Sequence, residues 1–450
     1  MKLSAALFLV LTLALSACSS DDVAPATAFV ITSLDQRIGG PASDTDVGDI
    51  AMENSEVRIG ILGDRCEGEG EWKRNCSSPG PGMFSGSMVD LDLNRRDGRY
   101  DKGQGVEAFA ELFASVNLDI TETRTVDILA DGADGGPAIV RSQGPAGNYI
   151  SYIELLSSFL DLPRSWQITD YILEPGDRFL TLRTHAIVAA EDVNGALIQP
   201  DRDPCGGWTQ GDDGLPCDGQ LLVPSPGTLQ LVDGINSQGI QLGDFFFAGG
   251  DVDIFVPTIG FDEGLHVNQF FLDGNNSISD PFTFPFVAAT GNGVSYAMGN
   301  GAMLSAPLFT SSLTAVFGGG VTPEVDANGD PIPLPVDFQL SYERYIAVGQ
   351  GDVGSALDAL FDAYVKNGVA VDLGTLTGRV LEETTMDPLS GVDVIVYRNT
   401  GAARDEHGLP PDEDIYSQFR TDIGQDSVAD GSFGGRLPAG DYLLVAKTPE

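Results

Sequence analysis

The sequence predicts a mainly β protein, in which a large antiparallel β-sandwich is followed by a second, smaller β-sandwich. The 56 glycines and 26 prolines in 450 residues favour many turns and therefore many short strands. Hydrophobic residues make up 42% of the chain, which is typical of globular domains. Many apolar segments also follow the two-residue period of a half-buried strand. A chain of this length can form two or three domains.

Residues 51–370 form the predicted large domain. Alternating or continuous apolar runs, bounded by turn residues, predict its strands. These strands are expected over residues 56–62, 87–93, 123–129, 138–141, 166–173, 178–188, 243–250, 252–256, 282–289, 295–298, 313–317 and 338–348. Between them, apolar residues recur at three- and four-residue steps over residues 106–116. That spacing predicts a short amphipathic helix.

One further helix is specified by its own residues. Asp352 can accept the first free amide hydrogens as an N-cap, and Gly368 lies where the helix ends. The apolar face between them contains Val353, Ala356, Leu357, Leu360, Phe361 and Tyr364. We expect this helix to lie between the large domain and the residues that follow it.

The first residues predict export and a lipid anchor. Ala5–Leu15 is an uncharged apolar run of eleven residues, which fits a signal peptide and is shorter than the roughly 20 residues of a membrane span. Cys18 follows the small residues Ser16 and Ala17, an arrangement that resembles a bacterial lipobox. The resemblance implies removal of residues 1–17 and attachment of acyl chains to Cys18, and several acyl chains anchor a protein stably. An ordinary secretory signal is the alternative.

The residues after Cys18 predict the location and a tether. Ser19, rather than aspartate, follows the cysteine, and by resemblance to enterobacterial sorting this indicates an outer membrane lipoprotein on the periplasmic or the surface face. Residues 18–50 are small, polar and acidic, which suits a flexible tether, with one early strand expected at residues 29–31. The membrane is therefore the first expected partner, through the lipid on Cys18.

The strong negative charge limits the choice of partners. The formal net charge is −42, and it becomes −43 without residues 1–17, which contain Lys2 and no acid. Such a surface repels nucleic-acid phosphates and anionic lipid headgroups, so we expect no nucleic-acid partner. The charge is compatible with weak calcium binding and with a glycan or an envelope protein as partner.

Past Cys18 the chain has four cysteines, an even number that indicates disulfide bonds in an exported protein. The residues are Cys66, Cys76, Cys205 and Cys217. The simplest arrangement pairs Cys66 with Cys76 and Cys205 with Cys217, although three connectivities are possible. Zinc is the rival interpretation, and we disfavour it because no Cys-x-x-Cys occurs and the chain has only three histidines.

The remaining candidate site residues each have a structural alternative that we prefer. His185 is expected to be structural, because it lies within a strand, beside Arg183 and Thr184. His266 lies near Asp262 and Glu263, a metal-like grouping that is more common among solvated turns. Trp72 and Trp208 lie in the two cysteine loops, where they can stack on sugars or cover a disulfide, and we prefer the second role.

Two aspartate-rich loops resemble calcium-binding loops, but we interpret them as turns. Asp326, Asn328 and Asp330 resemble the start of a calcium loop. Pro331 stands where such a loop needs glycine, and Asp337 stands where it needs glutamate, so a hairpin turn is the better interpretation. The loop that contains Asp131 and Asp134 is similar. We therefore assign no metal ligand, no cofactor and no catalytic residue.

Residues 374–450 carry motifs in the order of a known module. The motifs are the G-x-V opening at Gly378, the GV-x-V-x-V run at Gly391, DG-x-F at Asp430 and LP-x-G-x-Y at Leu437. Together they resemble the carboxypeptidase regulatory-like, transthyretin-type β-sandwich. The chain stops at Glu450, after what would be the penultimate strand of such a module, so we expect the module to be incomplete; a module with one strand fewer is the alternative.

The order of motifs along the chain resembles the N-terminal region of exported bacterial PHP-type (polymerase and histidinol phosphatase) metallohydrolases. The segments that carry this resemblance are EVRIGIL, GSMVDLDL, ADGADGGPAIVR, TDYILEPGDRFLTLRT, GDFFFAGGDVDIFVP and YERYIAVGQGDVGSAL. In that family the metal ligands lie in a C-terminal domain, so the resemblance implies no catalytic residue within these 450 residues.

These observations favour a lipid-anchored, non-catalytic accessory or binding region upstream of a metallohydrolase domain. The alternative is a free-standing envelope protein that binds carbohydrate or acts in adhesion, because transthyretin-like and starch-binding-like sandwiches resemble one another. An enzyme within these residues is the least favoured hypothesis.

Overall fold

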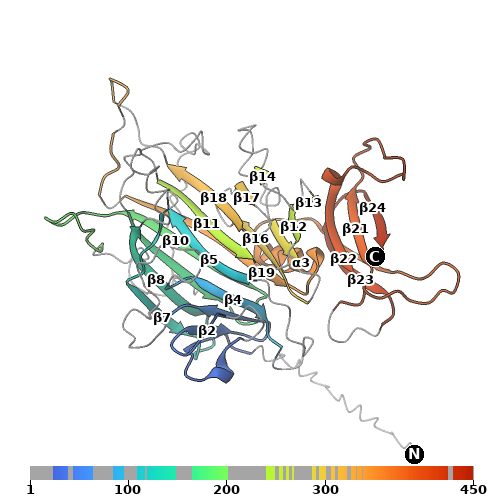
Figure 1. Cartoon of the computed structure of the whole chain (residues 1–450), viewed down its shortest axis with the longest axis horizontal. Helices are drawn as coiled ribbons and strands as arrows, with labels where there is room; N and C mark the ends of the chain where they lie inside the picture. Colours follow the sequence, from blue (N-terminus) through green and yellow to red (C-terminus); the bar gives the residue numbers. More distant parts are fainter. Residues whose placement is uncertain are drawn as a thin grey trace, which may run out of the picture.

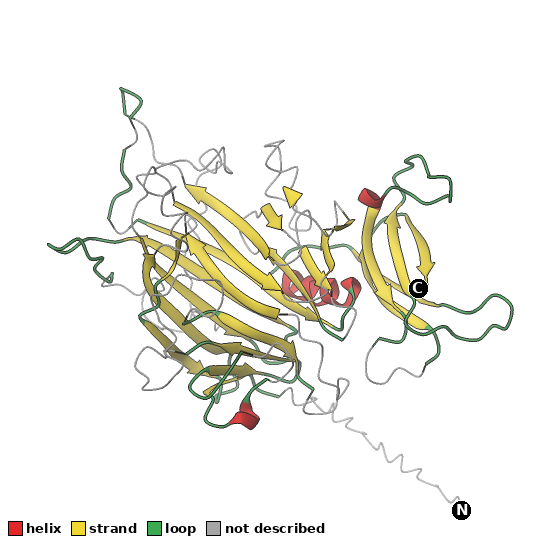
Figure 2. Ribbon diagram, viewed as in Figure 1, coloured by secondary structure: helices red, strands yellow, loops and turns green. Residues whose placement is uncertain are grey.

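The computed structural model confirms a mainly β protein with a large and a small antiparallel β-sandwich, as Figure 1 shows. It describes residues 24–38, 44–63, 85–95, 109–116, 119–147, 165–200, 240–248, 253–256, 260–262, 266–267, 286–289, 293–300, 306–309, 313–321, 326–330, 332–336, 338–423 and 429–448. Figure 2 shows how strands dominate both parts and how α3 (Val353–Lys366) lies between them.

One layer of the large sandwich is an antiparallel sheet that we call the helix-side sheet. Its strands pair in the order β7–β8–β9–β10–β19–β16–β15–β12–β13. Their bounds are β7 Thr125–Asp131, β8 Ala138–Gly147, β9 Ser165–Leu173, β10 Phe179–Val188, β19 Gln339–Gly349, β16 Ser295–Asn300, β15 Phe286–Ala289, β12 Asp253–Val256 and β13 Gly260–Asp262.

The other layer, which we call the N-terminal sheet, pairs in the order β1–β2–β3–β4–β5–β11–β18–β17–β14. Its strands are β1 Thr27–Val30, β2 Ile50–Glu53, β3 Val57–Ile61, β4 Met88–Leu93, β5 Phe109–Val116, β11 Ile240–Ala248, β18 Leu313–Val321, β17 Ala306–Phe309 and β14 His266–Val267. The short strand β6 (Asp119–Thr121) pairs with both β5 and β8 and so connects the two layers.

Aromatic side chains from both layers meet in the core of the large sandwich. The Phe109 ring centroid lies 5.3 Å from that of Phe246 in the same sheet and 5.4 Å from that of Tyr296 in the helix-side sheet. The Tyr296 hydroxyl donates to the Leu91 carbonyl across the layers at 2.8 Å. Full burial of each such apolar side chain contributes roughly 1.5–3 kcal/mol, so this core holds the layers together.

A charged pair also crosses the core. Arg344 in β19 donates to Asp244 in β11, and neither side chain has any exposed surface. The same guanidinium donates to the Thr184 hydroxyl of the neighbouring strand at 2.6 Å. Losing either charge would leave the other buried, which typically costs 3–5 kcal/mol. The pair therefore constrains which residues of the two layers face each other.

The small sandwich follows α3 and consists of two sheets. Strands β20 (Leu373–Arg379) and β23 (Ser432–Pro438) form one sheet. Strands β22 (Ile415–Arg420), β21 (Asp393–Arg398) and β24 (Tyr442–Lys447) form the other, in that order. The side chains between the two sheets form a core of their own, which contains Val394, Val396, Tyr416, Phe419 and Leu437.

The helix expected over residues 106–116 is wrong, because Phe109–Val116 form strand β5. Its register against β11 shifts so that Glu111 and Phe109 face consecutive residues, which leaves one residue over. Such a bulge turns both Phe109 and Leu112 into the core. Apolar residues three apart therefore mimic the helical period in a strand.

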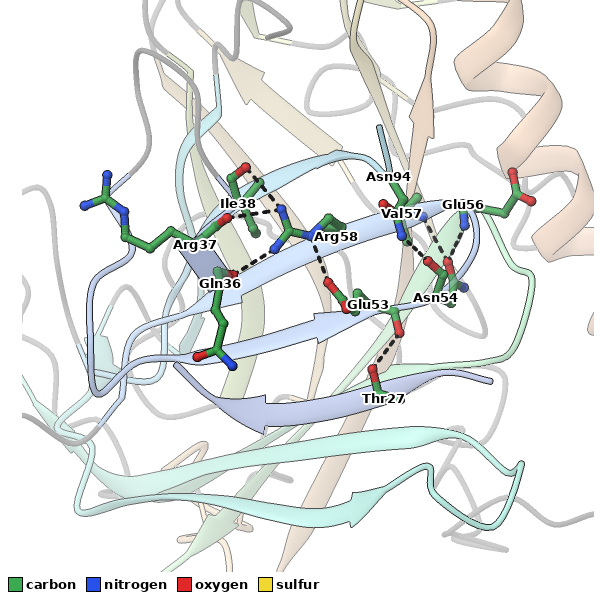
Figure 3. A network of polar contacts seen from close by, with 10 residues as sticks. All are labelled: Thr27, Gln36, Arg37, Ile38, Glu53, Asn54, Glu56, Val57, Arg58 and Asn94. Atoms are coloured by element: carbon green, nitrogen blue, oxygen red, sulfur yellow. Dashed lines mark hydrogen bonds and ion pairs between the residues drawn. The ribbon is translucent and has the colours of Figure 1, made fainter. Parts of the chain in front are cut away.

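Part of the segment expected to be a flexible tether is attached to the sandwich. The early strand is present as β1, which pairs with β2. It is followed by the short helix η1 (Leu34–Gln36), and Figure 3 shows how Arg58 of β3 contacts the end of this helix and the residues after it. The guanidinium of Arg58, which is 4% exposed, donates to the carbonyls of Gln36, Arg37 and Ile38 and to the Glu53 carboxylate.

We predict that Arg58→Ala lowers the free energy of unfolding by about 2–3 kcal/mol, because three carbonyls and one carboxylate lose a charged donor. Urea denaturation measures the change, and limited proteolysis reports whether residues 32–38 become accessible. The matched control is Arg124→Ala, because the Arg124 side chain is 64% exposed and pairs with Glu122 at 3.7 Å. A surface pair of this kind contributes less than about 1 kcal/mol. Equal losses in both variants would contradict the assigned role of Arg58.

Candidate functional site

The region that best qualifies as a functional site is the joint around α3, which includes the cleft beside it. The helix begins as predicted, because Asp352 accepts from the Ser355 amide at 2.9 Å, and Gly368 follows its end with a φ of +78°. Nine of its residues are buried: Val353, Gly354, Ala356, Leu357, Ala359, Leu360, Phe361, Ala363 and Tyr364. The helix is therefore covered on more than one face.

One face of α3 packs on the helix-side sheet. The Tyr364 ring stacks edge-on against Tyr345 of β19 at 5.9 Å, and Tyr345 in turn contacts Phe179 of β10 at 6.0 Å. Gly299 of β16 gives this packing room, because a Cβ there would lie 2.2 Å from the Tyr364 hydroxyl. The helix thus covers the outside of the large sandwich, and its position follows from the apolar face that the sequence predicts.

The start of α3 is bound to the small sandwich by hydrogen bonds. The Asp352 carboxylate accepts from the Arg420 amide at 3.0 Å as well as from Ser355, and the Val353 amide donates to the Gln418 side chain at 3.2 Å. Burial raises the pKa of Asp352, and the hydrogen bonds oppose that rise only in part. One side chain therefore caps the helix and also holds β22.

A second set of polar contacts lies one turn and more along the helix. The Arg436 amide of β23 donates to Asp358 at 2.9 Å, and its guanidinium pairs with Asp362 at 2.7 Å. Burial also raises the pKa of Asp358, which lies against the small sandwich. Asp352, Asp358 and Asp362 thus provide carboxylates along one side of the helix, and these bind residues of β22 and β23.

The Phe419 ring fills the space between these contacts. A Cβ at Gly354 of α3 would lie 2.1 Å from the ring, and one at Gly435 of β23 would lie 2.3 Å from it. Phe419 is buried and belongs to the core of the small sandwich. The Phe419 ring therefore packs against two glycines from different elements. The sequence did not predict this contact, because an isolated glycine in a helical pattern indicates only a loss of helix stability.

A polar cleft of about 580 Å³ opens beside this joint. Its described lining residues come from the large sandwich, from α3 and from the small sandwich. They are Arg178, Gln350, Asp352, Ser355, Asp358, Thr377, Gly378, Arg379, Ile423, Ser432, Phe433 and Gly434. The volume is within the range of small-molecule sites, which often occur between domains.

Several residues that the sequence singles out lie outside the described residues. They are the proposed lipid site Cys18, the cysteines Cys66, Cys76, Cys205 and Cys217, and the tryptophans Trp72 and Trp208. The disulfide and lipid assignments therefore stay predictions. Among the described residues, no helix has both the length and the apolar composition that a membrane crossing requires.

His185 is a buried part of the helix-side sheet. Its Nδ1 atom lies 2.7 Å from the Ser341 hydroxyl of β19 and 3.2 Å from the Gln339 amide nitrogen. Burial, together with the charge of Arg183, lowers the pKa of His185 to about 3, so the ring is neutral at physiological pH. These contacts agree with the structural role expected from the sequence.

His266 and Asp262 lie on strands of different sheets. His266 is in β14, which pairs with β17 of the N-terminal sheet, whereas Asp262 is in β13 of the helix-side sheet. Glu263 lies outside the described residues. Within the part of the chain that is described, no three histidine, cysteine, aspartate or glutamate residues cluster as metal ligands.

The aspartate loops are turns, as the sequence predicts. Asp326 accepts from the amides of Asn328 at 2.8 Å and Asp330 at 2.9 Å, and these hydrogen bonds lower its pKa. Asp131 accepts from Ala133 and Asp134 from Gly136 in the same way. The carboxylates thus stabilise their own loops, while Pro331 and Asp337 lie outside the described residues.

A row of alternating charges crosses the outer face of the helix-side sheet. Arg141, Asp170, Arg183 and Glu343 face one another in register on β8, β9, β10 and β19. Arg141 donates to Asp170 at 2.6 Å and Arg183 to Glu343 at 2.6 Å, and all four residues are buried. The sequence signal for this row is a single arginine or acid in each of β8, β9 and β10, and the adjacent Glu343 and Arg344 in β19.

No family model matches the chain, and no curated protein matches it. Similar solved structures include the Slr1438 protein from Synechocystis, with 7% identity, a TM-score of 0.29, and coverage of 68% of this chain and 97% of that one. Another is the alpha-N-acetylgalactosaminidase NagBb from Bifidobacterium bifidum, with 9% identity, a TM-score of 0.30, and coverage of 63% and 38%.

A variant of the GH36 alpha-galactosidase AgaA from Geobacillus stearothermophilus has 8% identity and a TM-score of 0.27, with coverage of 75% of this chain and 42% of that one. This chain thus spans less than half the length of NagBb and AgaA. At TM-scores below 0.5, these similarities support no argument about function.

We predict that Gly354→Ala destabilises the joint by about 1–3 kcal/mol, because the added methyl group clashes with the Phe419 ring. Calorimetry should show that the small sandwich unfolds at a lower temperature than in the wild type. Gly374→Ala in β20 is the control, since its Cβ would meet no atom closer than 3.9 Å. A loss in the control as large as in Gly354→Ala would contradict this account of the joint.

We also predict that His185 makes stability depend on pH. Its pKa is about 3 in the folded protein and 6.5 when exposed, so the unfolded chain binds the extra proton between these values. As pH falls below about 6.5, this residue alone removes up to about 1.4 kcal/mol per pH unit. His185→Gln should flatten the stability profile between about pH 6.5 and 5, as urea denaturation can measure. The control is His407→Gln, which removes a histidine whose side chain is 74% exposed.

Proposed function

We propose that this chain is a lipid-anchored cell-envelope protein whose two β-sandwiches form a non-catalytic accessory and binding region. The observation that carries the proposal is the burial of α3 by both sandwiches. Tyr364 packs on the large one, and Asp352 and Gly354 contact the small one. A helix buried in this way holds the small sandwich in one orientation relative to the large one.

The charged groups of the described sheets support a structural rather than a chemical use. Arg141 and Arg183 donate to carboxylates on neighbouring strands, and neutral His185 lies against Ser341. Arginine–carboxylate pairs of this kind hold neighbouring strands in register. The proposed role is therefore positioning and binding.

The motifs of residues 374–450, and the order of the segments before them, suggest which domain this region positions. In the PHP-type family that they resemble, such a region precedes a metallohydrolase domain, and we propose that α3 sets the orientation of that domain. The alternative is a free-standing envelope protein that binds carbohydrate or acts in adhesion. The polar cleft beside α3 favours the carbohydrate-binding part of this alternative.

We predict that Cys18→Ala releases the protein from membranes, because the thiol that would carry the lipid is lost. Membrane fractionation and incorporation of labelled palmitate in a bacterial host measure the effect. Ser19→Asp is the matched variant: it keeps the cysteine and, by resemblance to enterobacterial sorting, should move the protein to the inner membrane. If Cys18→Ala stays in the membrane fraction and labelling is unchanged, the anchor is not at Cys18.

A further inference from the structure

The cleft beside α3 has walls from both sandwiches. Arg178 and Gln350 belong to the large sandwich, directly before β10 and directly after β19. Thr377 and Arg379 of β20 lie opposite Gly434 and Ser432 of β23 and share one face of that sheet. A ligand in this cleft would contact both sandwiches at once.

The acidic groups of the cleft already accept hydrogen bonds within the protein. Asp352 accepts from the amides of Ser355 and Arg420, and Asp358 accepts from the amide and the guanidinium of Arg436. The Ser355 hydroxyl accepts from the Gln350 amide nitrogen of the main chain at 2.7 Å. These acceptors hold the joint together, so they are poorly suited to bind a ligand's donors or a cation.

The hydrogen-bond donors of the cleft make far fewer contacts within the protein. Within the described residues, Arg178 makes one long ion pair, 3.9 Å from Asp362, and Arg379 pairs through one nitrogen with Asp430. The side chains of Gln350 and Thr377 make no hydrogen bond there. An arginine has five N–H donors, so most of the donors of both arginines can serve a ligand. The excess of donors favours a ligand rich in acceptors.

The arginines and the neutral groups indicate different parts of a ligand. Two arginines on opposite walls suit a carboxylate, which guanidinium groups bind with paired hydrogen bonds. The Gln350 amide and the Thr377 hydroxyl suit a ring that carries hydroxyl groups on its edge. The volume of about 580 Å³ is larger than a lone carboxylate needs.

We propose that this cleft binds a saccharide that carries a carboxylate, such as a short chain of uronic acid residues. Arg178 and Arg379 bind the carboxylate from the two sandwiches, while Gln350 and Thr377 bind hydroxyl groups. The proposal names the ligand class for the binding role given above, but it depends only on the cleft. It can therefore fail while the lipid anchor and the positioning role stand, and the reverse also holds.

Calorimetric titration of the whole exported chain with digalacturonate tests the proposal, with neutral galactobiose as the matched ligand. We expect saturable binding of digalacturonate with a Kd below about 1 mM and at least tenfold weaker binding of galactobiose. Arg178→Gln and Arg379→Gln should each weaken digalacturonate binding roughly tenfold or more, because each removes a charged donor.

Two further variants keep the test independent of folding. Thr377→Tyr fills the cleft without changing charge and should abolish binding, while thermal unfolding confirms that the variant is folded. Arg124→Gln, which removes an exposed arginine outside the cleft, should bind as the wild type does. Absence of digalacturonate binding to the wild type, equal binding of galactobiose, or binding that survives Thr377→Tyr and both arginine variants would each overturn the proposal.

Discussion

The burial of α3 from two sides is the constraint on which the rest of this structure depends. A helix of 14 residues with nine of them buried cannot be exposed on either side without a large loss of apolar contact. The large sandwich supplies Tyr345 and Phe179 on one side, and the small sandwich supplies Phe419 on the other. Neither sandwich is therefore independent of the helix, and residues of the helix line the cleft between them.

Local signals were sufficient for much of the fold. The alternation of apolar residues predicted most strands, and α3 was predicted in full, since Asp352 and Gly368 mark its ends. The aspartate turns were also predictable, because their carboxylates bond to amides only a few residues away. In each of these cases, the interactions that decide the structure lie close together in the sequence.

Non-local pairing decided the features that the sequence did not predict. The bulge in β5 arises from its register with β11, about 130 residues later, and it made a strand look like a helix. The pairs Arg344–Asp244 and Arg183–Glu343 join strands that lie far apart in the chain. The cleft belongs to this class as well, because Arg178 and Arg379 are separated by more than 200 residues and line the same cleft only in the folded protein.

The attachment of the N-terminal segment has a mechanical consequence. A pulling force applied to the residues before Ala26 reaches the fold first at β1, whose four register pairs with β2 resist it. If β1 detaches, the load passes to the carbonyls of Gln36, Arg37 and Ile38, which Arg58 holds against β3. The N-terminal residues are thus joined to the rest of the N-terminal sheet by two attachments in series, and the first of them, β1, also contributes Ala28 to the core.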